Sequence, residues 1–194
     1  MRVLFIYVVA SFISDQILIS HKSIAYPTVT ISTLSIFTIV EFTLFSLFIF
    51  WAIKGKFFKN IIIISSSLFV LFAIIYFFLN MNSHKKFDSL PASIESIIII
   101  IFCILFLFDQ INTPEINILY ESPKFWVISG FLIYMAGGLF LFIYADSFTK
   151  EQKNYYWNIN AIINILKNIF IAIAFFMRKN SLASSSLRQQ SYNI

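Results

Sequence analysis

The sequence predicts an all-α fold, a polytopic transmembrane helix bundle of about six spans. Apolar residues make up 59% of the 194 residues and charged residues only 12%, and the mean hydropathy is +0.85. A soluble domain has about 25% charged residues and about 45–50% apolar ones. The apolar residues also gather in stretches close to the ~20 residues that an α-helix needs to cross a bilayer. These observations together indicate a multi-pass membrane protein.

Six apolar stretches are separated by short polar segments. The predicted spans are residues 3–19, 28–53, 60–80, 92–108, 125–145 and 156–177. We expect residues 1–178 to form one membrane domain, because no polar segment between the spans is long enough to fold alone. Residues 179–194 are polar and rich in serine, without apolar periodicity, and are expected to form a disordered tail.

The first predicted span, residues 3–19, has two interpretations. A basic start and an apolar run fit a signal peptide, but no small-residue cleavage site precedes Asp15. Tyr7, Ser11, Ser14 and Asp15 share one helical face, as expected of a retained helix with an inward-facing side. We favour a retained helix, and a cleaved signal stays open.

The second span carries Glu41 at its centre, with Thr38 on the same side of the helix. The fourth span is expected to begin near Pro91, because proline is tolerated in the first helical turn. Glu95 then lies one turn in, where a helix N-terminus stabilises a carboxylate. Tryptophans favour membrane interfaces. The expected interface anchors are Trp51, Trp126 and Trp157.

The fifth span contains three glycines that lie close to one side of the helix, Gly130, Gly137 and Gly138. Small residues let two membrane helices approach closely. The adjacent pair can also kink a helix. We therefore expect these glycines to mark a helix-packing surface.

The last span carries a polar stripe in an otherwise apolar helix. Its polar residues fall within an arc of about 100° at 3.6 residues per turn. A lysine near the bilayer midplane costs about 2.5–3.5 kcal/mol on insertion scales, so Lys167 is not expected to face lipid. Glu41 lies at the same depth, and we expect the second and sixth helices to meet there. The predicted buried polar cluster comprises Glu41, Lys167, Asn160, Asn164 and Asn168.

Two roles fit this cluster. Glu41 and Lys167 can form a proton- or ligand-coupled pair in a polar cavity, or an ion pair that fixes helix packing. The residues alone favour the structural role, and the asparagines likewise fit either a wet pathway or hydrogen bonds between helices. A retinal Schiff base on Lys167 is not expected, because six spans is one short and no matching proton-acceptor motif appears.

No metal site, cofactor or nucleic-acid partner is expected. His21 and His84 fall in predicted loops without acidic ligands at a defined spacing. Cys103 lies in an apolar run and is expected to pack. The G-x-S-x-G, H-E-x-x-H, P-loop and dinucleotide-binding motifs are missing. The sequence therefore favours a protein that is not an enzyme, with a lipid-modifying enzyme as the remaining enzymatic alternative.

Six spans place both termini on one side of the membrane. That side would collect eight basic residues, Arg2, Lys54, Lys56, Lys59, Lys124, Arg178, Lys179 and Arg188. The other side would carry five, Lys22, Lys85, Lys86, Lys150 and Lys153. Because cytoplasmic loops carry the excess of Lys and Arg, both termini are predicted to be cytoplasmic, in a bacterial inner membrane.

Four stretches carry a resemblance to known proteins. They are IVEFTLFSLFIF, IIIIIFCILFLFDQINTPE, SPKFWVISGFLIYMAGG and NINAIINILKN. In these stretches the chain resembles a group of small, uncharacterised bacterial multi-pass membrane proteins with six or seven helices. Some of those are similar to the membrane input regions of sensor kinases. The resemblance covers about residues 1–179 and implies no catalytic role.

From these observations we expect a non-enzymatic integral membrane protein with a buried polar cluster. It would act as a sensory, signalling-accessory or complex-assembly subunit, with a protein partner or as a homo-oligomer. The alternative is a small transporter or channel that uses the mid-membrane Glu, Lys and Asn side chains.

Overall fold

The computed structural model describes residues 2–22, 27–80, 89–112, 119–144 and 147–191. In these ranges the chain forms six α-helices and one short 3₁₀ helix and contains no strand, which confirms the predicted all-α class. The elements are α1 (Arg2–Lys22), α2 (Pro27–Ala52), α3 (Lys56–Asn80), α4 (Ser89–Ile111), η1 (Leu119–Glu121), α5 (Pro123–Tyr144) and α6 (Lys150–Ser191).

Five of the described helices are long and apolar enough to cross a membrane. Their apolar parts are Thr33–Ala52, Lys56–Asn80, Ser89–Ile111, Pro123–Tyr144 and Asn158–Met177. In α1 the apolar part, Val3–Ser14, is shorter. The whole of α1 has 21 residues, which corresponds to about 31 Å at a rise of 1.5 Å per residue. The chain is a multi-pass membrane protein.

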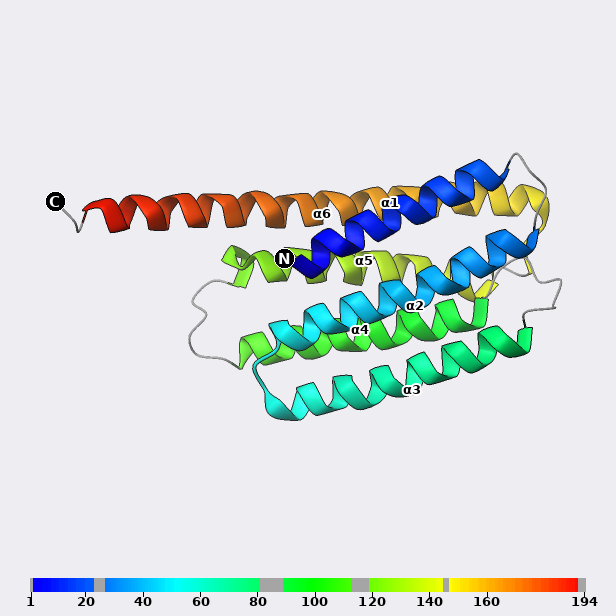
Figure 1. The fold of residues 1–194 in the computed structure, drawn as a ribbon, viewed down its shortest axis with the longest axis horizontal. Helices are drawn as coiled ribbons and strands as arrows, with labels where there is room; N and C mark the ends of the chain where they lie inside the picture. Colours follow the sequence, from blue (N-terminus) through cyan, green and yellow to red (C-terminus); the bar gives the residue numbers. More distant parts are fainter. Residues whose placement is uncertain (1, 23–26, 81–88, 113–118, 145–146, 192–194) are drawn as a thin grey trace.

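The helices alternate in direction, so that successive helices run up and down the same axis (Figure 1). α5 packs between α4 and α6, α2 packs against α3 and α4, and α1 packs on α2. α1 crosses the bundle obliquely, and the N- and C-terminal ends lie at the same end of the bundle, which we call the terminal end (Figure 1). This up-and-down order brings residues from both ends of the chain into one core.

A side chain of α4 forms hydrogen bonds with the junction between α2 and α3. Asp109, near the end of α4, accepts hydrogen bonds from the backbone N–H groups of Lys54 (2.8 Å) and Gly55 (3.1 Å). A Cβ atom at Gly55 would lie 2.8 Å from the Asp109 carboxylate, so the approach requires glycine. The first N–H groups of a helix have no partner in their own helix, and a carboxylate beside them is favourable.

Phenylalanines fill the half of the core nearer the terminal end. Five of them are at most 2% exposed, namely Phe42, Phe45, Phe102, Phe106 and Phe131. We call this set the aromatic layer. The rings of Phe45 and Phe131 stack with their centroids 3.7 Å apart, and those of Phe42 and Phe102 lie 6.3 Å apart. Between membrane helices, tight packing of this kind replaces the hydrophobic driving force available in water.

The last helix is longer than the sequence predicted. A span over residues 156–177 followed by a disordered tail was expected, but α6 runs without a break from Lys150 to Ser191. Residues 179–191 contain no proline or glycine, so nothing in the sequence stops the helix after the apolar part ends. The end of α6 projects past the other helices (Figure 1). Residues 192–194 of the predicted tail lie outside the described residues.

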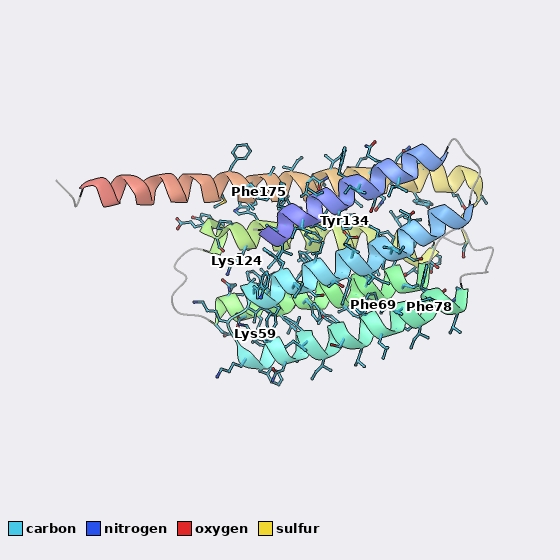
Figure 2. All side chains as sticks on the ribbon, viewed as in Figure 1. Lys59, Phe69, Phe78, Lys124, Tyr134 and Phe175 are labelled. Carbon is cyan, nitrogen blue, oxygen red and sulfur yellow. The ribbon has the colours of Figure 1, made fainter. Side chains whose placement is uncertain are left out.

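Two of the basic residues that were predicted for the cytoplasmic side lie together at one end of the bundle. Lys59 and Lys124 both lie at the terminal end, whereas Phe78 lies at the opposite end (Figure 2).

Trp51, one of the predicted interface anchors, is exposed near the end of α2. Trp126 is half-buried, and its indole N–H donates to the Tyr120 carbonyl at 2.7 Å. The side chain of Trp157 lies outside the described residues, and the interface role of all three tryptophans stays a prediction.

Candidate functional site

Lys167, on α6, is buried in the middle of the bundle with only 2% of its surface exposed. Its ammonium group donates a hydrogen bond to the hydroxyl of Tyr7 on α1. The same ammonium lies 3.8 Å from Glu41 Oε1, on α2. The Tyr7 hydroxyl in turn donates to Glu41 Oε1 at 2.8 Å. The structure therefore brings Glu41 and Lys167 together, with Tyr7 bridging them.

Aromatic faces complete the surroundings of the ammonium. Lys167 Nζ lies 4.0 Å from the ring centroid of Tyr134, 5.1 Å from that of Tyr7 and 5.4 Å from that of Phe131. A cation over an aromatic ring gains about 0.5–2 kcal/mol, and more when it is desolvated. A carboxylate, a hydroxyl and three rings thus replace the water that the lysine loses.

The predicted meeting of the second and sixth helices takes a different form in the structure. α2 and α6 are not among the helix pairs that pack extensively in the described part of the chain. The long side chain of Lys167 reaches from α6 toward α2, and Tyr7 of α1 lies between. The sequence placed Tyr7 on an inward face, but it did not indicate that Tyr7 would join the other two residues.

A cavity of about 200 Å³ adjoins this ion pair. It is lined by α1, α2, α4, α5 and α6, and it lies on the side of the aromatic layer away from the terminal end. Its polar lining residues are Ser11, Ser14, Thr38, Glu41, Glu95, Tyr134, Asn160, Asn164 and Lys167. The volume exceeds the roughly 150 Å³ that accommodates a benzene-sized ligand in an engineered protein cavity. The site can therefore hold a small molecule.

Glu95 is a member of the site that the sequence did not assign to it. We expected only a carboxylate near a helix N-terminus, but the side chain is 4% exposed and lines the cavity. Its Oε1 atom has no hydrogen-bond partner among the described residues. A signal was present in the sequence, because Glu95 lies on the same helical face as other small and polar residues of α4. The buried face of α4 includes Ala92, Glu95, Ser96, Cys103, Asp109 and Gln110.

The asparagine stripe divides between two surfaces. Asn160 and Asn164 are half-buried and line the cavity, and the Oδ1 atom of each lacks a hydrogen-bond partner in the described part of the structure. Asn168, expected in the buried cluster, is exposed and lines a separate groove between α1 and α6. The reason is geometric, because one residue after Lys167 is a rotation of about 100° around the helix.

Glycines bring α5 and α6 together beside Lys167. A Cβ atom at Gly130 would lie 2.7 Å from Phe170 Cβ and 3.2 Å from the Lys167 carbonyl oxygen. At Gly137 it would meet Ile163 Cδ1 at 2.9 Å. At Gly138 the nearest atom belongs to Phe142 of the same helix, at 2.9 Å. α5 is continuous through the Gly137–Gly138 pair.

The remaining candidate ligands do not gather. Within the described ranges, no three His, Cys, Asp or Glu side chains are close enough to hold a metal ion. The side chains of His21 and His84 lie outside the described residues. Cys103 is fully buried in the core cluster.

Comparison with known proteins finds no matching family model, no matching curated protein and no matching solved structure. The fold and the site nevertheless define a class of protein. The chain is a helical, multi-pass membrane protein with a cavity lined by the buried charged residues Glu41, Glu95 and Lys167.

Proposed function

We propose that this chain is a non-enzymatic sensory or signalling-accessory subunit of a bacterial inner membrane. In this proposal a small polar solute enters the cavity beside Lys167, and a protein partner carries the response. The observation that carries the proposal is the cavity itself, which places buried polar side chains of α2, α4 and α6 around a space large enough for a ligand.

The aromatic layer favours ligand binding in the cavity over transport of a solute across the membrane. The cavity lies on one side of the layer, and the five phenylalanines of the layer are almost completely buried. A channel needs a continuous path across the membrane. Transporters commonly bind their substrate where helices break near the midplane. The described helices α2 to α5 have no such break, including at Gly137 and Gly138.

The end of α6 offers a route to a partner. Residues 179–191 continue the helix beyond its apolar part, at the terminal end of the bundle. The positive-inside rule orients that end toward the cytoplasm. A solute that shifts Lys167 would act on the helix that extends there. The resemblance to membrane input regions of sensor kinases agrees with this arrangement.

A second candidate is a small transporter that moves a cation or proton through the cavity. Three ionisable side chains inside a membrane bundle are the observation that favours it, since such residues commonly mark ion and proton pathways. The two candidates differ in one measurable property, net movement of solute across the membrane.

The test combines flux with crosslinking. A fluorescent reporter fused after Ile194 serves for purification and, by folding only in the cytoplasm, reports orientation. We expect fluorescent cells and no ion or solute flux in proteoliposomes above that of protein-free vesicles. A photocrosslinking residue at Leu187, in the α6 extension, should give one adduct of defined mass in native membranes. The same residue at Phe78, which is exposed at the other end of the bundle, should give none.

Two results would contradict the sensory proposal. Flux that is present in the wild type and lost in Glu41→Gln would establish the transporter. A correctly inserted protein without any adduct specific to Leu187 would remove the partner. Dark cells with a normal yield of fusion protein would reverse the proposed orientation.

A further inference from the structure

The charges that face the cavity do not balance. Glu41 on α2, Glu95 on α4 and Lys167 on α6 are its ionisable lining residues apart from Tyr134 on α5. Lys167 lies 3.8 Å from Glu41 and donates to Tyr7, which is bonded to the same carboxylate. Lys167 also acts electrostatically on Glu95. The cavity lining therefore holds two carboxyl groups and one ammonium group.

The unpartnered polar atoms of the cavity are all hydrogen-bond acceptors. Glu95 Oε1, Asn160 Oδ1 and Asn164 Oδ1 are buried and have no donor among the described residues. They come from α4 and α6, which both contribute to the lining of the cavity. A buried acceptor without a donor is unfavourable, and more so when it is charged. Such atoms favour a ligand that carries several N–H donors.

The neighbouring aromatic rings already hold a group of this kind. The Lys167 ammonium lies 4.0 Å from the Tyr134 ring centroid, and both Tyr134 and Phe142 line the cavity. The site thus combines a buried carboxyl group, two amide carbonyls and aromatic surface. Proteins recognise ammonium groups with this combination. The cavity volume of about 200 Å³ limits the ligand to a small one.

We propose that the cavity binds ammonium or a short primary amine, with Glu95 as the counter-charge and Asn160 and Asn164 as hydrogen-bond acceptors. This inference rests on the proposed function, because it names the class of solute that the sensory cavity would take. A quaternary ammonium has the charge but no N–H donor, and sodium has neither the donors nor a preference for aromatic faces. These two cations therefore serve as controls.

The experiment measures ligand-dependent thermal stability of the full chain in nanodiscs. Ammonium, methylammonium and ethylammonium chloride are titrated at constant pH and ionic strength, with sodium and tetramethylammonium chloride as matched salts. We expect a concentration-dependent rise in Tm with the three N–H cations and none with the matched salts. Glu95→Gln should weaken the apparent affinity by about tenfold or more, because a hydrogen bond to a charged group is worth about 1.5–3 kcal/mol.

Two further variants, one in the cavity and one outside it, make the test specific to the cavity. Asn164→Ala should weaken binding by about fivefold, corresponding to one neutral hydrogen bond of about 1 kcal/mol. Glu121→Gln changes an exposed carboxylate of η1 and should bind like the wild type. Each variant is compared with its own ligand-free Tm, so a change in basal stability does not enter the result.

The inference would be overturned by equal shifts in sodium and ammonium salts, or by a full ammonium response in Glu95→Gln. Its failure is separable from that of the proposed function. A neutral or anionic solute that stabilises the wild type would leave a sensory cavity but contradict the amine. Flux lost in Glu41→Gln would contradict the sensory role while leaving amine binding intact.

Discussion

A lysine in the middle of a membrane helix is tolerated only if other groups replace its hydration, and Lys167 has three kinds of such groups. Glu41 supplies the opposite charge, Tyr7 supplies a hydroxyl, and Tyr134 supplies a ring face. The sequence predicted the first of these because Glu41 and Lys167 occupy similar depths in their spans. It did not predict Tyr7 as the bridge or Glu95 as a cavity residue, because depth does not determine which faces of helices meet.

Tyr7→Phe tests whether the Tyr7 hydroxyl bridges Glu41 and Lys167. The substitution keeps the ring and removes the hydroxyl that donates to Glu41 and accepts from Lys167. We expect a loss of about 1–3 kcal/mol in the free energy of unfolding, because both partners are charged and buried. The measurement is denaturant unfolding in mixed micelles. Tyr144→Phe, at an exposed position of α5, should change stability by less than about 0.5 kcal/mol. Equal losses in the two variants would exclude the bridge.

Helices were predictable from hydropathy, but some of their ends were not. The predicted spans 28–53 and 60–80 correspond to α2 (Pro27–Ala52) and α3 (Lys56–Asn80). α3 begins four residues before the predicted span, and Asp109 accepts hydrogen bonds from the two residues that precede α3, a contact between residues more than 50 positions apart. The end of α6 differs because its last part is polar and helical at once. Hydropathy reports neither long-range capping nor a helix that leaves the apolar region.

The contact between α5 and α6 gives a prediction for an entire helix pair. Gly130→Ala would place a methyl group 2.7 Å from Phe170 Cβ and 3.2 Å from the Lys167 carbonyl, where the backbone must move. We expect a loss of about 1–3 kcal/mol in unfolding free energy, which is typical of overpacking. Gly137→Ala is the matched control, because its Cβ meets side-chain atoms of Ile163 and no backbone atom, with Cδ1 nearest at 2.9 Å. A control that is as destabilised as Gly130→Ala would contradict this packing.

The number and order of the helices followed from the sequence, whereas their neighbours did not. The expected contact between α2 and α6 occurs through the side chains of Glu41 and Lys167, whereas the extensive packing is between α1 and α2 and between α5 and α6. The Glu41–Tyr7–Lys167 interaction joins these pairs across the middle of the bundle. One buried interaction thus ties the first and last helices of the chain to the second. This connection is the central structural claim.

A double-mutant cycle tests that claim most directly. The unfolding free energies of Glu41→Gln, Lys167→Met and the double variant are compared with the wild type. Removing one partner of a buried ion pair costs about 3–5 kcal/mol, because the other charge is left alone. The double variant should therefore recover part of the loss, with a coupling energy of about 1–3 kcal/mol. Glu121→Gln combined with Lys167→Met should be additive, since Glu121 is exposed in η1. Additive losses in the Glu41–Lys167 cycle as well would contradict the claim that these two residues meet.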